Sequence, residues 1–273
     1  MHRSLLTTLI AIAAALGCAG QTRLDYAADA DKAMAESRWA DAETALLAAL
    51  HSEPANPTNV MLVSNLGMAQ FYQGKDEEAL ANLTDAVNIS PRSVSIRENR
   101  AQVLTSLGRF EEADADYLTL LAADSTLYEP RFYHAMLALR TGQPETARTE
   151  IERLETMAPD RDETRIARAT YCVSLGDYAA AIPLYTRIIE NRPEAEYYGQ
   201  RAFCRLMTQD LHGASEDIGE AITLDPTDPD LYLYRAVLRK LQYRPVDADE
   251  DARRAIAHGI DPKRAAPLLL NSK

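Results

Sequence analysis

The chain of 273 residues lacks the patterns that strands and most catalytic sites require. No segment alternates apolar and polar residues with period two and runs of Val and Ile are absent, so the chain is predicted to be all-α. Its five histidines show no HExxH spacing, and Gly74-Lys75 has none of the other residues of a phosphate-binding loop. We therefore assign no catalytic residue, cofactor or metal, and predict that the chain is not an enzyme.

A concentrated basic surface is also missing. The net charge is −12, and the lysines and arginines are scattered among acidic residues. Nucleic-acid binding requires positive charge gathered on one face, so nucleic acid is not expected as a partner. Arg253-Arg254 and Lys263-Arg264 make the C-terminal end only mildly basic, which we interpret as a solvated surface.

The N-terminus has the pattern of an export signal. A basic start, Met1 to Arg3, precedes an uncharged stretch, Ser4 to Leu16, that is shorter than the ~20 residues of a membrane-spanning helix. We predict a signal peptide at residues 1–17 and a short tether at 18–22. Cleavage after Gly17 or Ala19, as in an ordinary signal peptide, would release a soluble exported protein.

The sequence Ala15-Leu16-Gly17-Cys18 resembles a bacterial lipobox. That resemblance implies cleavage before Cys18, lipid modification of its thiol, and contact with the membrane through this anchor only. Ala19 rather than an aspartate follows the cysteine, which in many Gram-negative envelopes favours the periplasmic face of the outer membrane. The expected location is therefore the cell envelope.

A unit of two amphipathic helices recurs along the rest of the chain. Its landmark is a small residue on the second helix, found at Ala42, Ala79, Ala113, Ala147, Ala181, Ala214 and Ala248, so that the period is close to constant. At a fixed distance before each landmark another small residue recurs, at Ala30, Gly67, Ala101, Ala135, Ala169, Ala202 and Ala236. The turn residue at position i−5 from the landmark is Gly74, Gly108, Gly142 or Gly176, with Ser37, Gln209 and Tyr243 as departures.

A helix–turn–helix unit with a period of about 34 is the signature of tetratricopeptide repeats. The chain resembles that family over about residues 23–262, which implies an all-α, right-handed superhelical solenoid of about seven repeats. The repeats are expected at 23–56, 60–93, 94–127, 128–161, 162–194, 195–228 and 229–262. Residues 57–59 lengthen one loop, and residues 263–273 are predicted to form a capping helix and tail in which Leu268 to Leu270 cover the last repeat.

Charged pairs follow the same period. An arginine and an aspartate stand at positions i and i+16 in three repeats, as Arg100 and Asp116, Arg201 and Asp217, and Arg235 and Asp251, with His134 and Glu150 at the same separation in a fourth. Because the pairs recur, we interpret them as structural ion pairs between the two helices of a repeat. Cys172 and Cys204 lie on neighbouring first helices and are interpreted as small buried apolar residues.

The family resemblance implies that the first helices line a concave groove that holds a protein or peptide partner. The inward positions carry aromatic, methionine and amide side chains, which suit protein recognition. These candidates are Asn65, Phe71, Tyr72, Asn99, Phe132, Tyr133, Met136, Gln200, Phe203 and Tyr234. The predicted function is a non-catalytic interaction scaffold of the bacterial envelope. The alternative is a soluble exported module for a small ligand or glycan, and the sequence assigns no oligomeric state.

Overall fold

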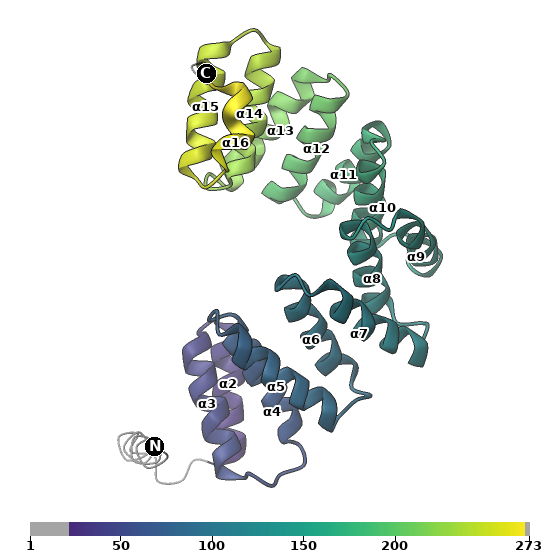
Figure 1. Ribbon diagram of the computed structural model, residues 1–273, viewed down its shortest axis with the longest axis vertical. Coiled ribbons are helices and arrows are strands. Elements are labelled where there is room, and N and C mark those ends of the chain that lie inside the picture. Colours follow the sequence, from purple (N-terminus) through teal and green to yellow (C-terminus); the bar gives the residue numbers. More distant parts are fainter. Residues whose placement is uncertain (1–21, 271–273) are drawn as a thin grey trace. The chain divides into compact units, whose positions relative to one another are not determined.

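The computed structural model describes residues 22–270, which are helical apart from short turns and loops (Figure 1). They form two compact units, residues 22–130 and 131–270, and each is described here by itself. The predicted signal peptide, Cys18 and residues 271–273 lie outside the described residues. Between residues 22 and 270, no helix is both long and apolar enough to cross a bilayer.

The helices follow one another as antiparallel pairs, which confirms the all-helical repeat fold. The first helices of the pairs are α2 (Arg23–Ala35), α4 (Asn59–Phe71), α6 (Val94–Ser106), α8 (Tyr128–Arg140), α10 (Asp162–Ser174), α12 (Ala195–Met207) and α14 (Pro229–Leu241). The second helices are α3 (Trp39–Ser52), α5 (Asp76–Ile89), α7 (Phe110–Ala123), α9 (Pro144–Met157), α11 (Tyr178–Asn191), α13 (Leu211–Leu224) and α15 (Pro245–Ala257).

The landmark positions carry small residues because the two helices of a repeat are in close contact there. All seven landmark alanines are at most 1% exposed. At Gly67, a Cβ atom would lie 2.7 Å from the side chain of Leu83 and 2.9 Å from the carbonyl oxygen of Ala79. Since the second neighbour is backbone, even alanine would force α4 and α5 apart. The close approach of the two helices therefore explains the recurring small pair.

The turns between paired helices share one backbone conformation. The glycines at the turn position, Gly74, Gly108, Gly142 and Gly176, have φ between 72° and 76°. The three departures adopt the same left-handed conformation, with φ of 55° at Ser37, 62° at Gln209 and 58° at Tyr243. This conformation costs a residue with a side chain roughly 1–2 kcal/mol relative to glycine. Those three positions are thus locally strained.

Replacing Gln209 by glycine is expected to stabilise the protein. The left-handed strain disappears, while the larger freedom of glycine in the unfolded chain offsets part of the gain, leaving about 0.5–1 kcal/mol. Gly108→Ala is the reverse control, since its Cβ would meet no atom within 4 Å and only the backbone strain would count. Urea unfolding followed by circular dichroism measures both changes. Equal stability of Gln209→Gly and wild type would contradict the expectation.

The predicted ion pairs are confirmed in three repeats, and each aspartate holds two arginines. Asp116, Asp217 and Asp251 are at most 2% exposed. The predicted arginines donate to these carboxylates: Arg100 to Asp116 at 2.7 Å, Arg201 to Asp217 at 2.6 Å and Arg235 to Asp251 at 2.7 Å. The second partners are Arg97 at 2.5 Å, Arg205 at 2.9 Å and Arg239 at 2.7 Å.

In the fourth repeat the acidic residue is Glu150, which pairs with Arg131 and, at 2.8 Å, with Arg153. Arg131 occupies the position that Arg97 has in the third repeat, because both stand at i−19 relative to the acidic partner. In the fifth repeat, where Leu184 replaces the acid, Arg168 instead donates to Glu155 of the preceding helix at 2.7 Å. The charge pattern therefore serves contacts within and between repeats.

The end of the described chain forms the predicted cap. Helix α16 (Pro262–Ala265) is followed by the 3₁₀ turn η1 (Ala266–Leu268), since Pro267 cannot continue an α-helix. Leu268 and Leu269 pack against the apolar cluster of α14 and α15, whereas Leu270 is 51% exposed. Two of the three leucines thus cover the last repeat as expected.

Two further expectations concern a loop and the cysteines. The loop between α3 and α4 spans residues 53–58 and is longer than the loop 90–93 between α5 and α6, as expected from the extra residues 57–59.

Cys172 and Cys204 are free thiols, and Cys204 is completely buried in the cluster that contains Tyr185 and Ile188. Burial raises the pKa of Cys204 to about 11. The interpretation as a small buried apolar residue is therefore confirmed for Cys204, whereas Cys172 is only partly buried.

Candidate protein-binding surface of the first helices

In each unit, two first helices of successive repeats are in contact: α4 with α6 in the first unit and α12 with α14 in the second. The ten candidate residues lie on first helices or, in the case of Tyr72, directly after one, and they fall into two groups. The first unit holds Asn65, Phe71, Tyr72 and Asn99, and the second unit holds Phe132, Tyr133, Met136, Gln200, Phe203 and Tyr234. The structure therefore brings candidates together within a unit, and each group is considered separately.

In the first unit, Tyr72 is the most exposed candidate, with 46% of its surface accessible. Its ring stacks on Trp39 of the preceding repeat, with centroids 4.2 Å apart and an interplanar angle of 19°. Phe71 packs against a buried cluster instead. Asn99 donates from Nδ2 to Ser64 Oγ at 3.1 Å, so part of its hydrogen-bonding capacity is used between α4 and α6.

In the second unit, three rings form a continuous contact, here called the aromatic row: Tyr178, Phe203 and Tyr234. Phe203 meets Tyr178 edge-on at 5.6 Å and Tyr234 at 5.7 Å, measured between centroids. Burial raises the pKa of Tyr234 to about 12, and the neighbouring Asp230 carboxylate adds to this shift. The row therefore joins repeats five, six and seven, and its members are largely packed side chains.

Tyr133 differs from the aromatic row because 48% of it is exposed. Its ring contacts Phe132 edge-on at 5.2 Å, on the same helix α8. Met136 and Gln200 are partly buried, while Met207, at the end of α12, is 51% exposed. Among the candidates of this unit, Tyr133 is the large apolar side chain most available to a partner.

Sequence reasoning missed the part that second helices play in this surface. Trp39 and Tyr178 are the first residues of α3 and α11, yet their rings support Tyr72 and Phe203. The signal was present, because both come shortly after the turn residues Ser37 and Gly176.

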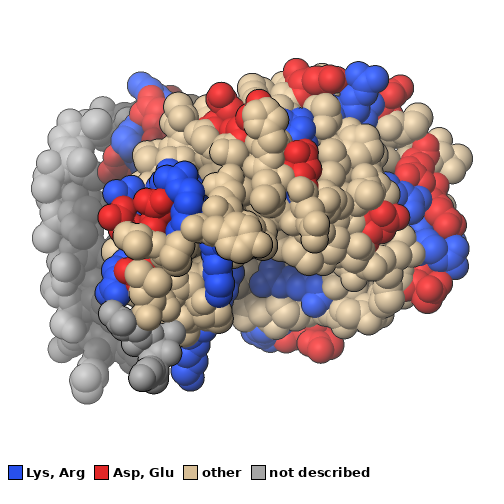
Figure 2. All heavy atoms as spheres, turned by 90° about the horizontal axis from the view of Figure 1, so that it is seen from above, with Lys and Arg blue, Asp and Glu red and all other residues tan. Residues whose placement is uncertain are grey.

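Two carboxylates, Glu98 and Glu129, influence each other in the first unit. Partial burial and the nearby Glu129 carboxylate raise the pKa of Glu98, on α6, above its ordinary value. Elsewhere the charges are mixed: in Figure 2, lysines and arginines alternate with acidic residues around uncharged surface. Burial of Glu98, together with its repulsion from Glu129, is therefore a local cost to the stability of the first unit.

Glu98→Gln is expected to stabilise the chain at pH 7. Because the folded state raises the pKa of Glu98, ionisation opposes folding, and wild-type stability falls as the pH rises through about 4.3 and beyond. The advantage of the variant should consequently shrink as the pH falls below this range. Urea midpoints at pH 4 and pH 7 test this, with the exposed Glu111→Gln as control. An advantage that stayed the same at both pH values would argue against the raised pKa.

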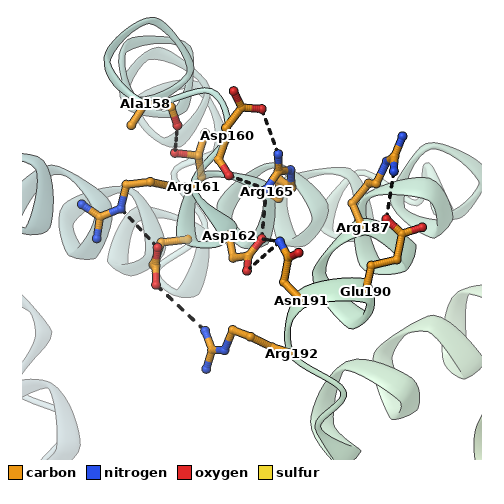
Figure 3. Close-up of polar contacts among 11 residues, drawn as sticks. Ala158, Asp160, Arg161, Asp162, Arg165, Arg187, Glu190, Asn191 and Arg192 are labelled. Carbon is orange, nitrogen blue, oxygen red and sulfur yellow. Dashed lines mark hydrogen bonds and ion pairs between the residues drawn. The ribbon is translucent and has the colours of Figure 1, made fainter.

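A dense polar cluster lies where the loop between α9 and α10 meets the end of α11 (Figure 3). Arg165 pairs with Asp160 at 3.0 Å and with Asp162 at 2.9 Å. Asn191 donates to Asp162 at 3.1 Å, and Arg192 approaches Glu163 at 3.9 Å. These groups satisfy one another, so the cluster connects two repeats. Nowhere in residues 22–270 do three or more His, Cys, Asp or Glu side chains gather as a metal site would require.

The repeat geometry agrees with comparison to known proteins. The tetratricopeptide repeat model matches residues 28–92, 64–127 and 134–196. The chain belongs to the tetratricopeptide repeat family. Such repeats form scaffolds that typically mediate protein–protein interactions, and proteins built from them bind protein partners.

Solved tetratricopeptide structures cover nearly the whole chain. A tetratricopeptide repeat protein from Parabacteroides merdae is 27% identical, with a TM-score of 0.74, and the match covers 92% of this chain and 98% of that one. The Cut9–Hcn1 hetero-tetramer structure matches with a TM-score of 0.71 over 91% of this chain and 55% of that one, at 14% identity. The second likeness shows the fold alone.

Curated relatives match this chain over a small part of their own length. The TPR repeat-containing thioredoxin TTL4 of Arabidopsis thaliana is 28% identical over 160 residues, which is 53% of this chain and 23% of that protein. Tetratricopeptide repeat protein 13 of Homo sapiens is 27% identical over 142 residues, 50% of this chain and 16% of that protein. The chain thus spans less than a quarter of the length of these relatives.

Proposed function

We propose that the chain is a non-catalytic scaffold of the bacterial cell envelope that binds a protein or peptide on its first helices. The observation that carries this proposal is the exposure of Tyr133 on α8. A large aromatic side chain that is 48% exposed does little for the fold, whereas such residues supply much of the binding energy at protein interfaces.

The ten candidates divide into four roles under this proposal. Tyr72 and Tyr133 are exposed and supply the contact area. Asn65, Asn99 and Gln200 provide polar groups that fix the orientation of a partner backbone, while Phe71, Phe132 and Met136 line the surface beneath it. Phe203 and Tyr234 support the surface from within, because each ring packs against the other. Recognition therefore centres on the tyrosines rather than on the aromatic row.

The envelope location rests on the lipobox-like sequence that ends at Cys18. A lipid on this cysteine would hold the repeats at the membrane surface, since several acyl chains together give stable attachment. The proposed site is the periplasmic face of the outer membrane. Cys18→Ser should remove the full-length protein from the detergent phase of a Triton X-114 extract, and a variant that still partitions there would exclude the lipid anchor.

The binding proposal is tested by affinity capture from detergent-solubilised envelopes of the native host. Tyr133→Ala is compared with Met157→Ala, which removes an exposed apolar side chain, 40% accessible, from the second helix of the same repeat. One envelope protein should be retained by wild type and Met157→Ala and lost with Tyr133→Ala. Equal capture by all three proteins would place recognition on another face.

The alternative function, binding of a small ligand or glycan, needs aromatic faces that are open for stacking. Phe203 instead presents its ring to Tyr178 and Tyr234, and Tyr72 is already stacked on Trp39. The ring geometry therefore favours the protein partner. Absence of any captured protein, together with binding on a glycan array, would reverse this preference.

A further inference from the structure

The turn between α14 and α15 departs from the repeat pattern at two positions. Where four other repeats have glycine, this turn has Tyr243, which is 94% exposed in the left-handed conformation. Where repeats two to four have Glu77, Glu111 and Glu145, it has Val246, which is 62% exposed. The fold requires neither side chain, since the other repeats build the same turn without them.

These two residues belong to a larger exposed apolar group, here called the repeat-seven patch: Leu241, Tyr243, Val246 and Leu270. Leu241 is 47% exposed and Leu270 is 51% exposed. The backbone N–H of Leu270 donates at 3.0 Å to Oδ1 of Asp249, which follows Val246 by one helical turn, so Leu270 lies beside the turn. Apolar residues gathered in this way on a surface mark an interaction site.

The charges around the patch are balanced within the chain. Arg244 pairs with Asp247 at 2.7 Å, and Arg253 pairs with Asp249 at 2.8 Å. Between residues 239 and 254 there are five basic and four acidic side chains, in a chain whose net charge is −12. Two copies of an acidic chain repel each other wherever their surfaces carry net negative charge. The repeat-seven patch is surrounded by balanced charges, so two copies can approach each other there without this repulsion.

We propose that the repeat-seven patch is an isologous contact through which two copies of this chain form a dimer. Each Tyr243 ring lies across Leu241 and Val246 of the other copy, about a two-fold axis. Four apolar side chains cover less than the ~800 Å² per partner of a standard interface, so the dimer is reversible and forms at micromolar concentrations. None of the four patch residues is among the ten candidates for partner binding, so the two contacts can be tested separately.

Sedimentation velocity between about 1 and 200 μM tests the proposal on the full chain. All proteins carry Cys18→Ser, so that a lipid cannot drive association. Wild type should convert from monomer to dimer with concentration, and Tyr243→Gly should weaken the dimer about tenfold or more. Tyr243→Gly also relieves the backbone strain, so loss of the dimer cannot be attributed to misfolding.

Gln209→Gly is the matched control, because it makes the same backbone change in the preceding repeat, where the turn has no exposed aromatic ring. It should dimerise like wild type. Val246→Glu, which restores the residue type of repeats two to four, should again favour the monomer by placing two like charges at the contact. A wild type that stays monomeric throughout, or Tyr243→Gly that dimerises as wild type does, would overturn the proposal.

Discussion

Asp217→Ala is expected to destabilise the protein by about 3 kcal/mol, because removing one partner of a buried ion pair leaves an uncompensated buried charge. The carboxylate accepts from Arg201 at 2.6 Å and from Arg205 at 2.9 Å, and it is 2% exposed. Removing it leaves two arginine side chains, 12% and 20% exposed, without their common counter-ion. Urea unfolding followed by circular dichroism measures the loss of free energy.

The adjacent residue gives a matched control. Glu216 pairs with His212 at 3.4 Å, but its side chain is 63% exposed, so Glu216→Ala should change stability by less than about 1 kcal/mol. A triple variant, Arg201→Met with Arg205→Met and Asp217→Leu, should recover most of the loss, because no buried charge is then left unpaired and Asp210, which loses Arg205 at 3.5 Å, is exposed. A single Asp217→Ala variant as stable as wild type would show that water replaces the carboxylate.

The sequence predicted one arginine of each pair but not the other. Arg201 was found because its separation of 16 from Asp217 recurs in other repeats. The second arginine does not keep one position: Arg205 stands one helical turn after Arg201, whereas Arg97 stands one turn before Arg100. Either position reaches the same carboxylate from a neighbouring turn of the first helix. A search for one fixed spacing therefore finds only the arginine that stands 16 residues before the aspartate in all three repeats.

The turn positions show a similar limit. Ser37, Gln209 and Tyr243 were recognised as departures from glycine, and their left-handed φ values show that the repeat geometry overrides the local preference of these residues. Packing of the paired helices determines the turn. What the sequence could not give is the exposure of Tyr243, which depends on the open space around the turn.

For the candidate surface, the period predicted which residues lie on the first helices but not which of them are covered. Phe203 and Tyr133 both come from first helices, α12 and α8, yet Phe203 is enclosed by rings from the neighbouring repeats while Tyr133 stays 48% exposed. A first-helix side chain is covered only where a helix of a neighbouring repeat supplies an aromatic side chain that reaches it. That information belongs to pairs of repeats rather than to the repeat itself.

The anchor at Cys18 and the outer-membrane location stay predictions from the stretch Met1 to Ala19. Cys18 lies outside the described residues 22–270, and none of the contacts described for the repeats involves it. The tests of anchoring and of partner binding are therefore separate. Loss of the anchor would leave the binding proposal standing.

Phe203→Ala is expected to destabilise the second unit by about 3 kcal/mol, because truncating a phenylalanine in such a position loses both its burial and its ring contacts. The ring contacts Tyr178 of repeat five and Tyr234 of repeat seven, and it packs against the buried cluster around Tyr185. Urea unfolding by circular dichroism measures the effect, and the fluorescence of Trp39, the one tryptophan of the chain, reports on the first unit separately.

Two variants separate the causes of that loss. Phe203→Leu keeps an apolar side chain and should lose only the contribution of the ring contacts, about 0.5–1.5 kcal/mol. Met207→Ala, one turn later on α12 and 51% exposed, should change stability by less than about 0.5 kcal/mol. If Phe203→Ala were as mild as Met207→Ala, the aromatic row would have to be solvent-exposed. Phe203 would then become a contact residue for the partner, alongside Tyr133.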